Sequence, residues 1–327
     1  MADDIVLRGV TKTFGAKVAV RDLDMAIPEG SMYGFIGPNG AGKTTTIRMI
    51  MSILFPDSGE VSVLGKRSAL EAKDRIGYLP EERGIYRKMK VGAFLAYMAR
   101  LKGREGVKIK RAVREWLERI GLADVENKKC EELSKGMQQK VQFVAAIIHA
   151  PDLLILDEPF SGLDPVNMRL LRDLVLEQHR RGATIIFSTH VMIQAEQICN
   201  QVVMINDGEK VLDDTLASIR LTYDPRSLLF EPLDPGMDVA PLRRLPGVTS
   251  VSRANGAYEI SLAEDHAPVE AMREIVAAMP AARVELNRPT LEDVFVRIVT
   301  GEGKGDAEEV ARLRASVRNG AGSEVEP

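Results

Sequence analysis

Two hydrophobic patterns follow one another in the first part of the chain, and each predicts a different kind of strand. Residues 5–27 alternate apolar and polar positions, with turns at Phe14–Gly15 and Pro28–Gly30, which is typical of strands with one buried face. The stretches D-L-L-I-L-D-E (152–158) and T-I-I-F-S-T (184–189) are almost continuously apolar before their polar ends, as in strands covered on both faces of a parallel sheet. The pattern predicts an α/β core with an antiparallel, strand-rich edge.

Further short elements complete this core. S-M-Y-G-F-I (31–36) leads through a glycine-rich turn into the helical T-T-T-I-R-M-I-M, and strand, loop and helix in this order form a parallel α/β unit. The remaining predicted elements are short strands at 60–64 and 76–78, a helix over 170–181 and a hairpin around Asp207–Gly208.

A helical insertion interrupts the core between about residues 84 and 136. Val113, Trp116, Leu117 and Ile120 fall at i, i+3, i+4 and i+7, which is one stripe of an amphipathic helix. Residues 100–119 hold eight Lys and Arg against three Asp and Glu. This basic face has two interpretations: a solvated surface, or a surface that docks against a membrane-embedded partner.

The pattern changes again at residues 222–225, where a small α+β module begins. Strands are expected at S-L-L-F-E, on both sides of an Asn255–Gly256 turn and at R-V-E-L-N, with helices at P-V-E-A-M-R-E-I-V-A-A-M and T-L-E-D-V-F-V-R-I-V. From Gly301 the chain is rich in Gly, Glu and Arg and lacks aromatics, which predicts disorder with a short helical segment near 307–316. We therefore expect domains at 1–221 and 222–300 and a disordered tail at 301–327.

Composition narrows the class of protein. The 327 residues carry a formal net charge of −3, which gives no electrostatic drive toward nucleic acid. The two cysteines, Cys130 and Cys199, form neither a disulfide framework nor a zinc motif, which fits a reducing compartment. M-A-D-D does not resemble a signal peptide, and no apolar run reaches the roughly 18 residues of a spanning helix. We expect a protein that is soluble by itself and reaches a membrane only through a partner.

The glycine-rich turn is the first candidate for chemistry. Gly37–Thr44 fits G-x-x-x-x-G-K-[ST] and lies between a predicted strand and a predicted helix, as this motif requires. Its backbone N–H groups would surround a β-phosphate, Lys43 would neutralise phosphate oxygens and Thr44 would bind Mg²⁺. A nucleotide phosphate site is predicted here.

Two carboxylates follow the buried strand that ends at residue 157. Asp157 is placed to hold Mg²⁺ through water, and Glu158, pointing the other way, to accept a proton from an attacking water. An Asp-Glu pair alone often only begins a loop, but the glycine motif upstream favours catalysis. His190 ends another strand and is a candidate γ-phosphate contact, whereas His149, His179 and His266 are interpreted as structural.

The motif series, taken in order, resembles that of the ATP-binding cassette (ABC) ATPases over roughly residues 3–220. The matching segments are Thr13–Gly15 (aromatic loop), Gly37–Thr45 (Walker A), Tyr78–Glu81 (Q-loop), Leu133–Met137 (signature), Leu153–Glu158 (Walker B), Ser161–Asp164 (D-loop) and His190 (switch histidine). The resemblance implies a P-loop NTPase cassette with a mixed sheet and a helical insertion.

The resemblance also implies roles for residues. ATP would be bound by Phe14, which stacks on adenine, and by Gly37, Pro38, Asn39, Gly40, Ala41, Gly42, Lys43, Thr44 and Thr45. Thr44, Asp157 and Glu81 would ligate Mg²⁺, and the catalytic groups would be Glu158, His190 and Lys43. Ser134 and Gly136 would bind the γ-phosphate of ATP held by a second copy, so that ATP joins two copies and hydrolysis releases them.

Two departures from the family pattern concern turnover. Lys135 and Met137 replace the usual glycine and glutamine of L-S-G-G-Q, although Ser134 and Gly136 remain. Glu81 replaces the Q-loop glutamine; its carboxylate still suits Mg²⁺ but adds negative charge beside the γ-phosphate. We expect real but modest ATPase activity.

The leading function is the ATP-hydrolysing subunit of a membrane exporter: a homodimer on the inner face of the cell membrane, bound to a separately encoded permease and not to nucleic acid. Tyr86–Met98 would receive the permease's coupling helix.

The alternatives are a soluble ABC ATPase acting on nucleic acid or ribosomes, and a nucleotide-dependent regulator with little turnover. Residues 222–300 resemble the accessory domain of bacterial sodium and drug efflux ATPases, with either a regulatory, dimer-stabilising role or a purely stabilising one. The transported substrate is recognised by the permease, not by this chain.

Overall fold

The fold is described from a computed structural model, which covers residues 2–82, 84–224, 226–254 and 256–301. The described part of the chain divides into two compact units, residues 2–216 with 298–301, and Ala217–Arg297, and each is described by itself. Across the described ranges, no helix is both long enough and apolar enough to cross a bilayer.

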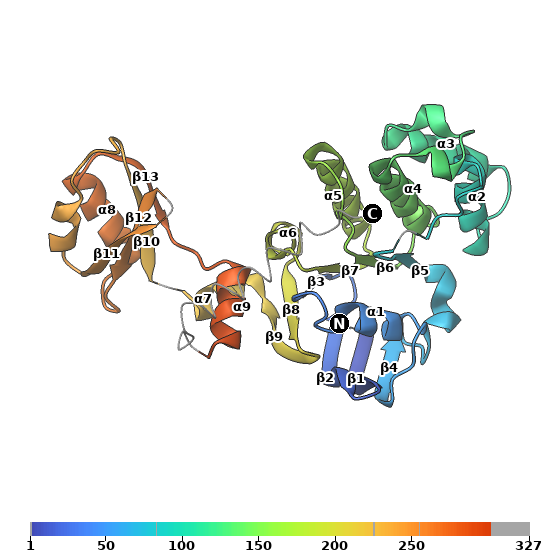
Figure 1. The fold of residues 1–327 in the computed structure, drawn as a ribbon, viewed down its shortest axis with the longest axis horizontal. Helices are drawn as coiled ribbons and strands as arrows, with labels where there is room; N and C mark the ends of the chain where they lie inside the picture. Colours follow the sequence, from blue (N-terminus) through green and yellow to red (C-terminus); the bar gives the residue numbers. More distant parts are fainter. Residues whose placement is uncertain (1, 83, 225, 255, 302–327) are drawn as a thin grey trace. The chain divides into compact units, whose positions relative to one another are not determined.

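The first unit begins with a three-stranded antiparallel sheet in the order β2-β1-β4 (Figure 1). Its strands are β1 (Asp3–Phe14), β2 (Lys17–Pro28) and β4 (Ser58–Val63). Alternate positions of β1, Ile5 and Leu7 among them, are buried in the core, as the alternating pattern predicted.

A six-stranded sheet in the order β5-β6-β7-β3-β8-β9 forms the centre of this unit. The first five strands in this order are parallel, and β9 pairs antiparallel with β8. The bounds are β3 (Met32–Ile36), β5 (Ile76–Leu79), β6 (Leu153–Asp157), β7 (Thr184–Thr189), β8 (Gln201–Asn206) and β9 (Glu209–Thr215). Every residue of β3, β6 and β7 is buried, which explains their nearly continuous apolar sequences. Because parallel strands end at one edge, the loops after β3, β5, β6 and β7 meet there.

Helices connect these strands and form the predicted insertion. The bounds are α1 (Lys43–Ile50), α2 (Val91–Leu101), α3 (Lys108–Arg119), α4 (Lys135–Ile147), α5 (Pro165–Arg180) and α6 (Met192–Ile198), with 3₁₀ turns at Ala69–Arg75, Ala123–Val125 and Cys130–Glu132. α5 begins five residues before the predicted start because Asp164 caps it, accepting hydrogen bonds from Val166 N and Asn167 N.

The stripe predicted on α3 is only partly buried. Val113, Leu117 and Ile120 are buried, whereas Trp116 is half-exposed. The Arg119 guanidinium lies 4.3 Å from the centre of the Trp116 ring, so a cation–π contact covers this side chain instead of the core.

The second unit is the predicted α+β module. Its antiparallel sheet has the order β11-β12-β10-β13, with β10 (Ser227–Pro232), β11 (Val248–Ala254), β12 (Ala257–Leu262) and β13 (Ala281–Leu286). The helices here are α7 (Leu216–Thr222), α8 (Pro268–Ala278) and α9 (Leu291–Val299), with a 3₁₀ turn at Ala240–Arg244. Ala271 and Ile275 of α8 pack with Phe230 and Ile260 of the sheet in one hydrophobic cluster. Asn255, half of the predicted turn, and residues 302–327 of the tail predicted at 301–327 lie outside the described residues.

Candidate functional site

The glycine-rich loop after β3 has a backbone that only glycine tolerates at two positions. Gly37 has φ +153°, and a Cβ there would lie 2.1 Å from the Ile205 carbonyl oxygen. Gly42, the residue before α1, has φ +109°, and its Cβ would lie 2.4 Å from the Ala19 carbonyl oxygen. The loop is therefore fixed tightly against β8 and β2, and its position at the start of α1 is suited to binding an anion.

A cavity of about 320 Å³ opens beside this loop. It is lined by Phe14, Lys17, Ala19, Asn39, Gly40, Gly42, Lys43, Thr44, Thr45, Glu81 and Glu158. The structure thus brings nine predicted site residues to one cavity, from four separate segments of the chain. Gly37, Pro38 and Ala41 are not among its lining residues. Lys17 and Ala19 were not predicted, although both directly follow the aromatic loop.

Lys43 is buried and turned toward its own loop. Its Nζ donates to the carbonyl oxygens of Gly37 (2.7 Å) and Pro38 (3.0 Å). Burial lowers the pKa of Lys43, and the nearby carboxylates of Glu158, Asp157 and Glu81 act against that lowering. The ammonium group is held by two backbone carbonyl oxygens of the loop. The charged phosphate oxygens of a nucleotide would be stronger hydrogen-bond acceptors than these carbonyl oxygens.

Phe14 lies at the open side of the cavity with 51% of its surface exposed. The end of β1 that carries it is fixed by Asp57, whose Oδ2 accepts hydrogen bonds from the N–H and hydroxyl of Thr13, both at 2.7 Å. Lys12 donates to the other carboxylate oxygen, and these hydrogen bonds lower the pKa of Asp57 to about 2. The hydrogen bonds to Asp57 therefore fix the end of the strand that carries the exposed Phe14 ring.

Glu158 follows β6 in a left-handed backbone conformation, with φ +47°. Its Oε1 accepts from His190 N (2.8 Å) and lies 2.6 Å from His190 Nδ1, and its Oε2 accepts from the Thr189 hydroxyl (3.1 Å). Because an ionised carboxylate only accepts, the contact places the imidazole proton on Nδ1. The end of β7 therefore orients Glu158, and Thr189 is a contributor that the sequence did not single out.

Asp157 has a different hydrogen-bond partner from Glu158, although both partners lie at the end of β7. Its Oδ1 accepts from the Ser188 hydroxyl at 2.9 Å, while Oδ2 is buried and has no partner at hydrogen-bond distance among the described residues. Burial raises the pKa of Asp157 to about 6, and the Ser188 hydrogen bond partly offsets this. The Thr44 hydroxyl is nonetheless near enough to this carboxyl to act against the rise in its pKa. A buried carboxylate oxygen without a donor is suited to a cation or its bound water.

Glu81 is shared by two neighbouring cavities. The second, of about 350 Å³, is lined by Thr44, Arg48, Ile53, Tyr78, Pro80, Glu81, Glu82, Gly84 and Asp157. The residue at the predicted Q-loop position therefore lies between the glycine-loop cavity and a separate surface hollow.

Ser134 and Gly136 are in a different place. Neither lines the glycine-loop cavity. Ser134 is the N-cap of α4 and accepts a hydrogen bond from Met137 N at 3.3 Å, as expected for a serine at a helix start. Gly136 is in the first turn, and a Cβ there would lie 3.6 Å from Leu163 Cδ2 of the predicted D-loop. The signature segment thus adjoins the D-loop of its own chain and lies apart from the residues that line the glycine-loop cavity.

The parallel sheet, the glycine loop and the carboxylates at the strand ends define a nucleotide-binding α/β protein. Residues 20–161 match the ABC transporter family, and residues 215–299 match the family described as "ATP-binding protein DrrA1-3-like, C-terminal domain". The chain belongs to the ATP-binding proteins of ABC transporters. Members of this family bind and hydrolyse ATP, so the chain is an ATPase.

Relatives match over nearly the full length. The uncharacterized ABC transporter ATP-binding protein YhaQ of Bacillus subtilis (strain 168) is 41% identical over 290 residues, 89% of this chain and 96% of that protein. The Nod factor export ATP-binding protein I of Burkholderia orbicola (strain AU 1054) is 31% identical over 306 residues, 91% of this chain and 97% of that protein. A solved ATP-binding subunit of an ABC transporter is 30% identical, with a TM-score of 0.63 over 67% of this chain and 92% of that chain.

Proposed function

We propose that the chain is the energy-coupling subunit of a membrane exporter, working as two identical copies on a separately encoded permease. The observation that carries the proposal is the separation, within one chain, of the signature residues Ser134 and Gly136 from the cavity that holds the other site residues. An ATPase built in this way needs a second copy to complete each site. Export is supported by the similarity to a Nod factor export protein.

In this proposal the predicted site residues have the following roles. The loop from Gly37 to Gly42, with Thr45, surrounds the phosphates, Lys43 neutralises their charge, and Phe14 stacks on the adenine. Glu158 accepts a proton from the attacking water, and His190 and Thr189 hold its carboxylate in position. Ser134 and Gly136 contact the γ-phosphate of ATP held by the other copy, at the N-terminus of α4.

The residues present fit a Mg²⁺ ion. The buried Asp157 Oδ2 has no donor among the described residues, and the Thr44 hydroxyl lines the same hollow as Asp157 and Glu81. Hard oxygen ligands of this kind, with nucleotide phosphates and water completing the shell, suit Mg²⁺. When bound, the ion neutralises phosphate charge; Thr44 and Asp157 would hold it, with Glu81 nearby.

The permease would dock where the Q-loop enters the helical insertion. Tyr86 is 53% exposed, and its ring makes edge contacts with Phe94 (6.0 Å between centroids) and Tyr97 (5.8 Å). Ile53, which is 59% exposed, lines the hollow beside Glu81. Exposed aromatic and aliphatic side chains beside a hollow suit an amphipathic helix from a partner. Docking there would place the subunit in the cytoplasm, peripheral on the inner membrane face.

The domain assignment is part of the same proposal: a nucleotide-binding domain over residues 1–221 with its helical subdomain at about 84–136, an accessory domain over 222–300, and a tail from 301. The accessory domain would stabilise or regulate the assembly. No nucleic-acid partner is proposed, because the net charge of −3 gives no general attraction to phosphate backbones.

Trapping the closed state tests the proposal. The tagged Glu158→Gln chain, expressed in its native cell and supplied with ATP and Mg²⁺, should bind ATP without hydrolysing it. We expect a multi-span membrane protein to co-purify with it, at higher yield than with Lys43→Ala, which should not retain ATP. A trapped chain that stays free of membrane proteins, or that brings ribosomes or DNA, would contradict the membrane assignment and leave the ATPase activity in place.

A further inference from the structure

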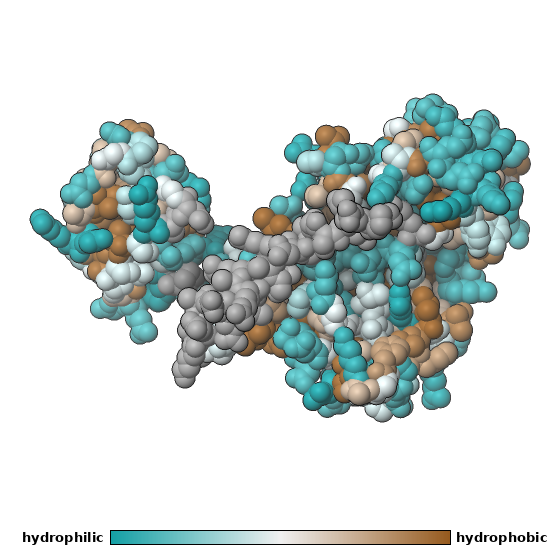
Figure 2. Space-filling view, viewed as in Figure 1, coloured by the Kyte–Doolittle hydropathy of each residue, from teal (hydrophilic) through white to brown (hydrophobic). Residues whose placement is uncertain are grey.

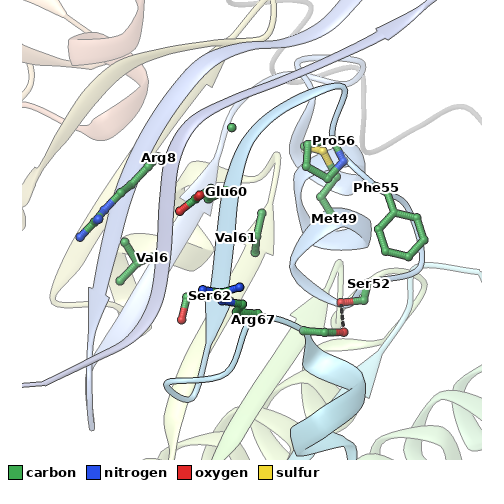
Figure 3. Close-up of a pocket in the computed structure, with 12 residues that line it drawn as sticks. Val6, Arg8, Met49, Ser52, Phe55, Pro56, Glu60, Val61, Ser62 and Arg67 are labelled. Carbon is green, nitrogen blue, oxygen red and sulfur yellow. Dashed lines mark hydrogen bonds between the residues drawn. The ribbon is translucent and has the colours of Figure 1, made fainter.

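A third cavity, away from the nucleotide site, lies along the free edge of the antiparallel sheet (Figure 3). Its volume is about 590 Å³, compared with about 320 Å³ for the glycine-loop cavity, and it is within the size range of ligand pockets. It is lined by Val6, Arg8, Met49, Ser52, Phe55, Pro56, Gly59, Glu60, Val61, Ser62, Arg67 and Ser68. None of these residues belongs to the predicted ATP site.

One side of this cavity is apolar. Met49, Phe55 and Pro56 come from the end of α1 and the segment after it, and Val61 comes from β4 (Figure 3). Figure 2 shows apolar side chains gathered on the surface beside β4, and Phe55 is 67% exposed. An apolar ligand that covers this exposed ring would remove apolar surface from water, which favours binding.

The other side is basic and offers donors. Arg8 and Arg67 line the cavity, and neither guanidinium forms a hydrogen bond or ion pair with the described residues. One carboxylate, Glu60, also lines the cavity and is the cross-strand neighbour of Arg8. The two arginines and this one glutamate give the lining a net charge of +1. A guanidinium that is not committed elsewhere can bind a carboxylate, sulfonate or phosphate with two parallel hydrogen bonds.

The strand itself adds backbone donors. β4 is at the edge of its sheet and, among the described strands, pairs only with β1. Four consecutive residues of this segment, 59–62, line the cavity, so it runs along the unpaired edge. An edge strand presents backbone N–H groups to whatever lies beside it.

We propose that this cavity binds an amphipathic organic anion, with its acid group on Arg8, Arg67 and the edge of β4 and its apolar body against Met49, Phe55 and Val61. A purely apolar ligand would leave both guanidinium groups unused, and a small inorganic anion would leave the apolar side exposed. A cavity with one apolar side and one basic side therefore favours a ligand that has both an apolar body and an acid group.

Two fluorescent probes that differ mainly in one acid group test this on the purified full chain. 1-Anilinonaphthalene-8-sulfonate carries a sulfonate, and N-phenyl-1-naphthylamine has the same ring system without it. We expect Arg8→Gln with Arg67→Gln to weaken sulfonate binding by about tenfold or more, because charge-assisted hydrogen bonds are lost, while binding of the neutral probe changes less than about twofold. Arg100→Gln, an exposed arginine on α2, is the matched control and should change neither.

Three results would overturn this proposal. Equal affinity of the two probes for the unmodified chain, or an unchanged sulfonate affinity in the double arginine variant, would overturn the proposal. Competition between the sulfonate probe and ATP would also overturn it, because it would place the probe in the nucleotide cavity. Retained ATPase activity of the double variant confirms that it is folded, so a loss of probe binding would not be a folding defect.

Discussion

Glu158 contacts both the backbone and the side chain of His190: its Oε1 accepts a hydrogen bond from the backbone N–H at 2.8 Å and lies 2.6 Å from the imidazole Nδ1. The two residues directly follow the neighbouring parallel strands β6 and β7 and are 32 positions apart in the sequence. The carboxylate is therefore held in place by residues of its own chain, as the general base proposed here would require.

The first prediction concerns this carboxylate. Glu158→Gln keeps the size of the side chain but removes its basicity, so steady-state phosphate release should fall by about 10²- to 10⁴-fold. ATP binding should persist, since the glycine loop and Lys43 are unchanged. Phosphate release and equilibrium ATP binding measured on the same preparation check both parts, with Glu71→Gln as a surface control. A variant that retains more than a tenth of the activity would exclude Glu158 as the base.

The second prediction concerns Glu81, the carboxylate at the Q-loop position. It lines the cavity together with Glu158, and its charge would oppose the build-up of negative charge on the phosphates. Glu81→Gln should therefore raise the maximal ATPase rate, by roughly two- to tenfold. Rates measured at saturating ATP and Mg²⁺ decide this. An unchanged rate would mean that the substitution found in this chain does not tune turnover.

The third prediction is a pH dependence of stability. His149 is buried after α4, its Nε2 lies 3.2 Å from the Ile76 carbonyl oxygen, and burial, reinforced by the charge of Lys102, lowers its pKa to about 4. The unfolded chain has the ordinary histidine pKa of about 6.5, so between pH 6.5 and 4 it binds more protons than the folded chain, and stability falls as pH falls. The titration of His149 alone should lower the free energy of unfolding by about 2 kcal/mol between pH 7 and pH 5.

Urea unfolding at both pH values, compared between the native chain and His149→Gln, measures that contribution. The variant is expected to be less stable at pH 7, but its loss between pH 7 and pH 5 should be smaller than that of the native chain. Equal losses in the two proteins would show that His149 does not titrate differently in the folded and unfolded states.

The sequence predicted the elements better than the side-chain arrangement. The β1–β2 hairpin, the buried parallel strands and the glycine loop follow from local patterns: period-two alternation, continuous apolar runs and a motif whose glycines need unusual backbone angles. The grouping of Lys43, Asp157 and Glu158 was predicted because parallel strands end at a common sheet edge. Motif order supplied the rest of the predicted site.

Other features depend on tertiary contacts that no local pattern encodes. Trp116 fits the apolar stripe of α3 but is covered by Arg119 instead of the core. Thr189 reaches the site only because β7 pairs with β6. The cavity along β4 was not predicted either, since it forms between the edge of one sheet and the end of α1, and neither segment alone carries a ligand motif.

The central claim is that each ATP site is shared by two copies of this chain, and mixing two inactive variants tests it most directly. Lys43→Ala removes the lysine proposed to bind phosphate, and Ser134→Arg blocks the signature serine at the start of α4. In a mixed dimer one site carries both changes and the other carries neither. Random mixing in equal amounts should therefore restore about a quarter of the native sites in a symmetric dimer.

Each variant alone should have almost no ATPase activity, and the mixture should recover a substantial fraction of the native rate as the two chains exchange partners. Recovery of this kind is the result that the account predicts. If Lys43→Ala and Ser134→Arg are each inactive and folded, and their mixture stays as inactive as either alone under conditions where the chains exchange, the shared site is contradicted.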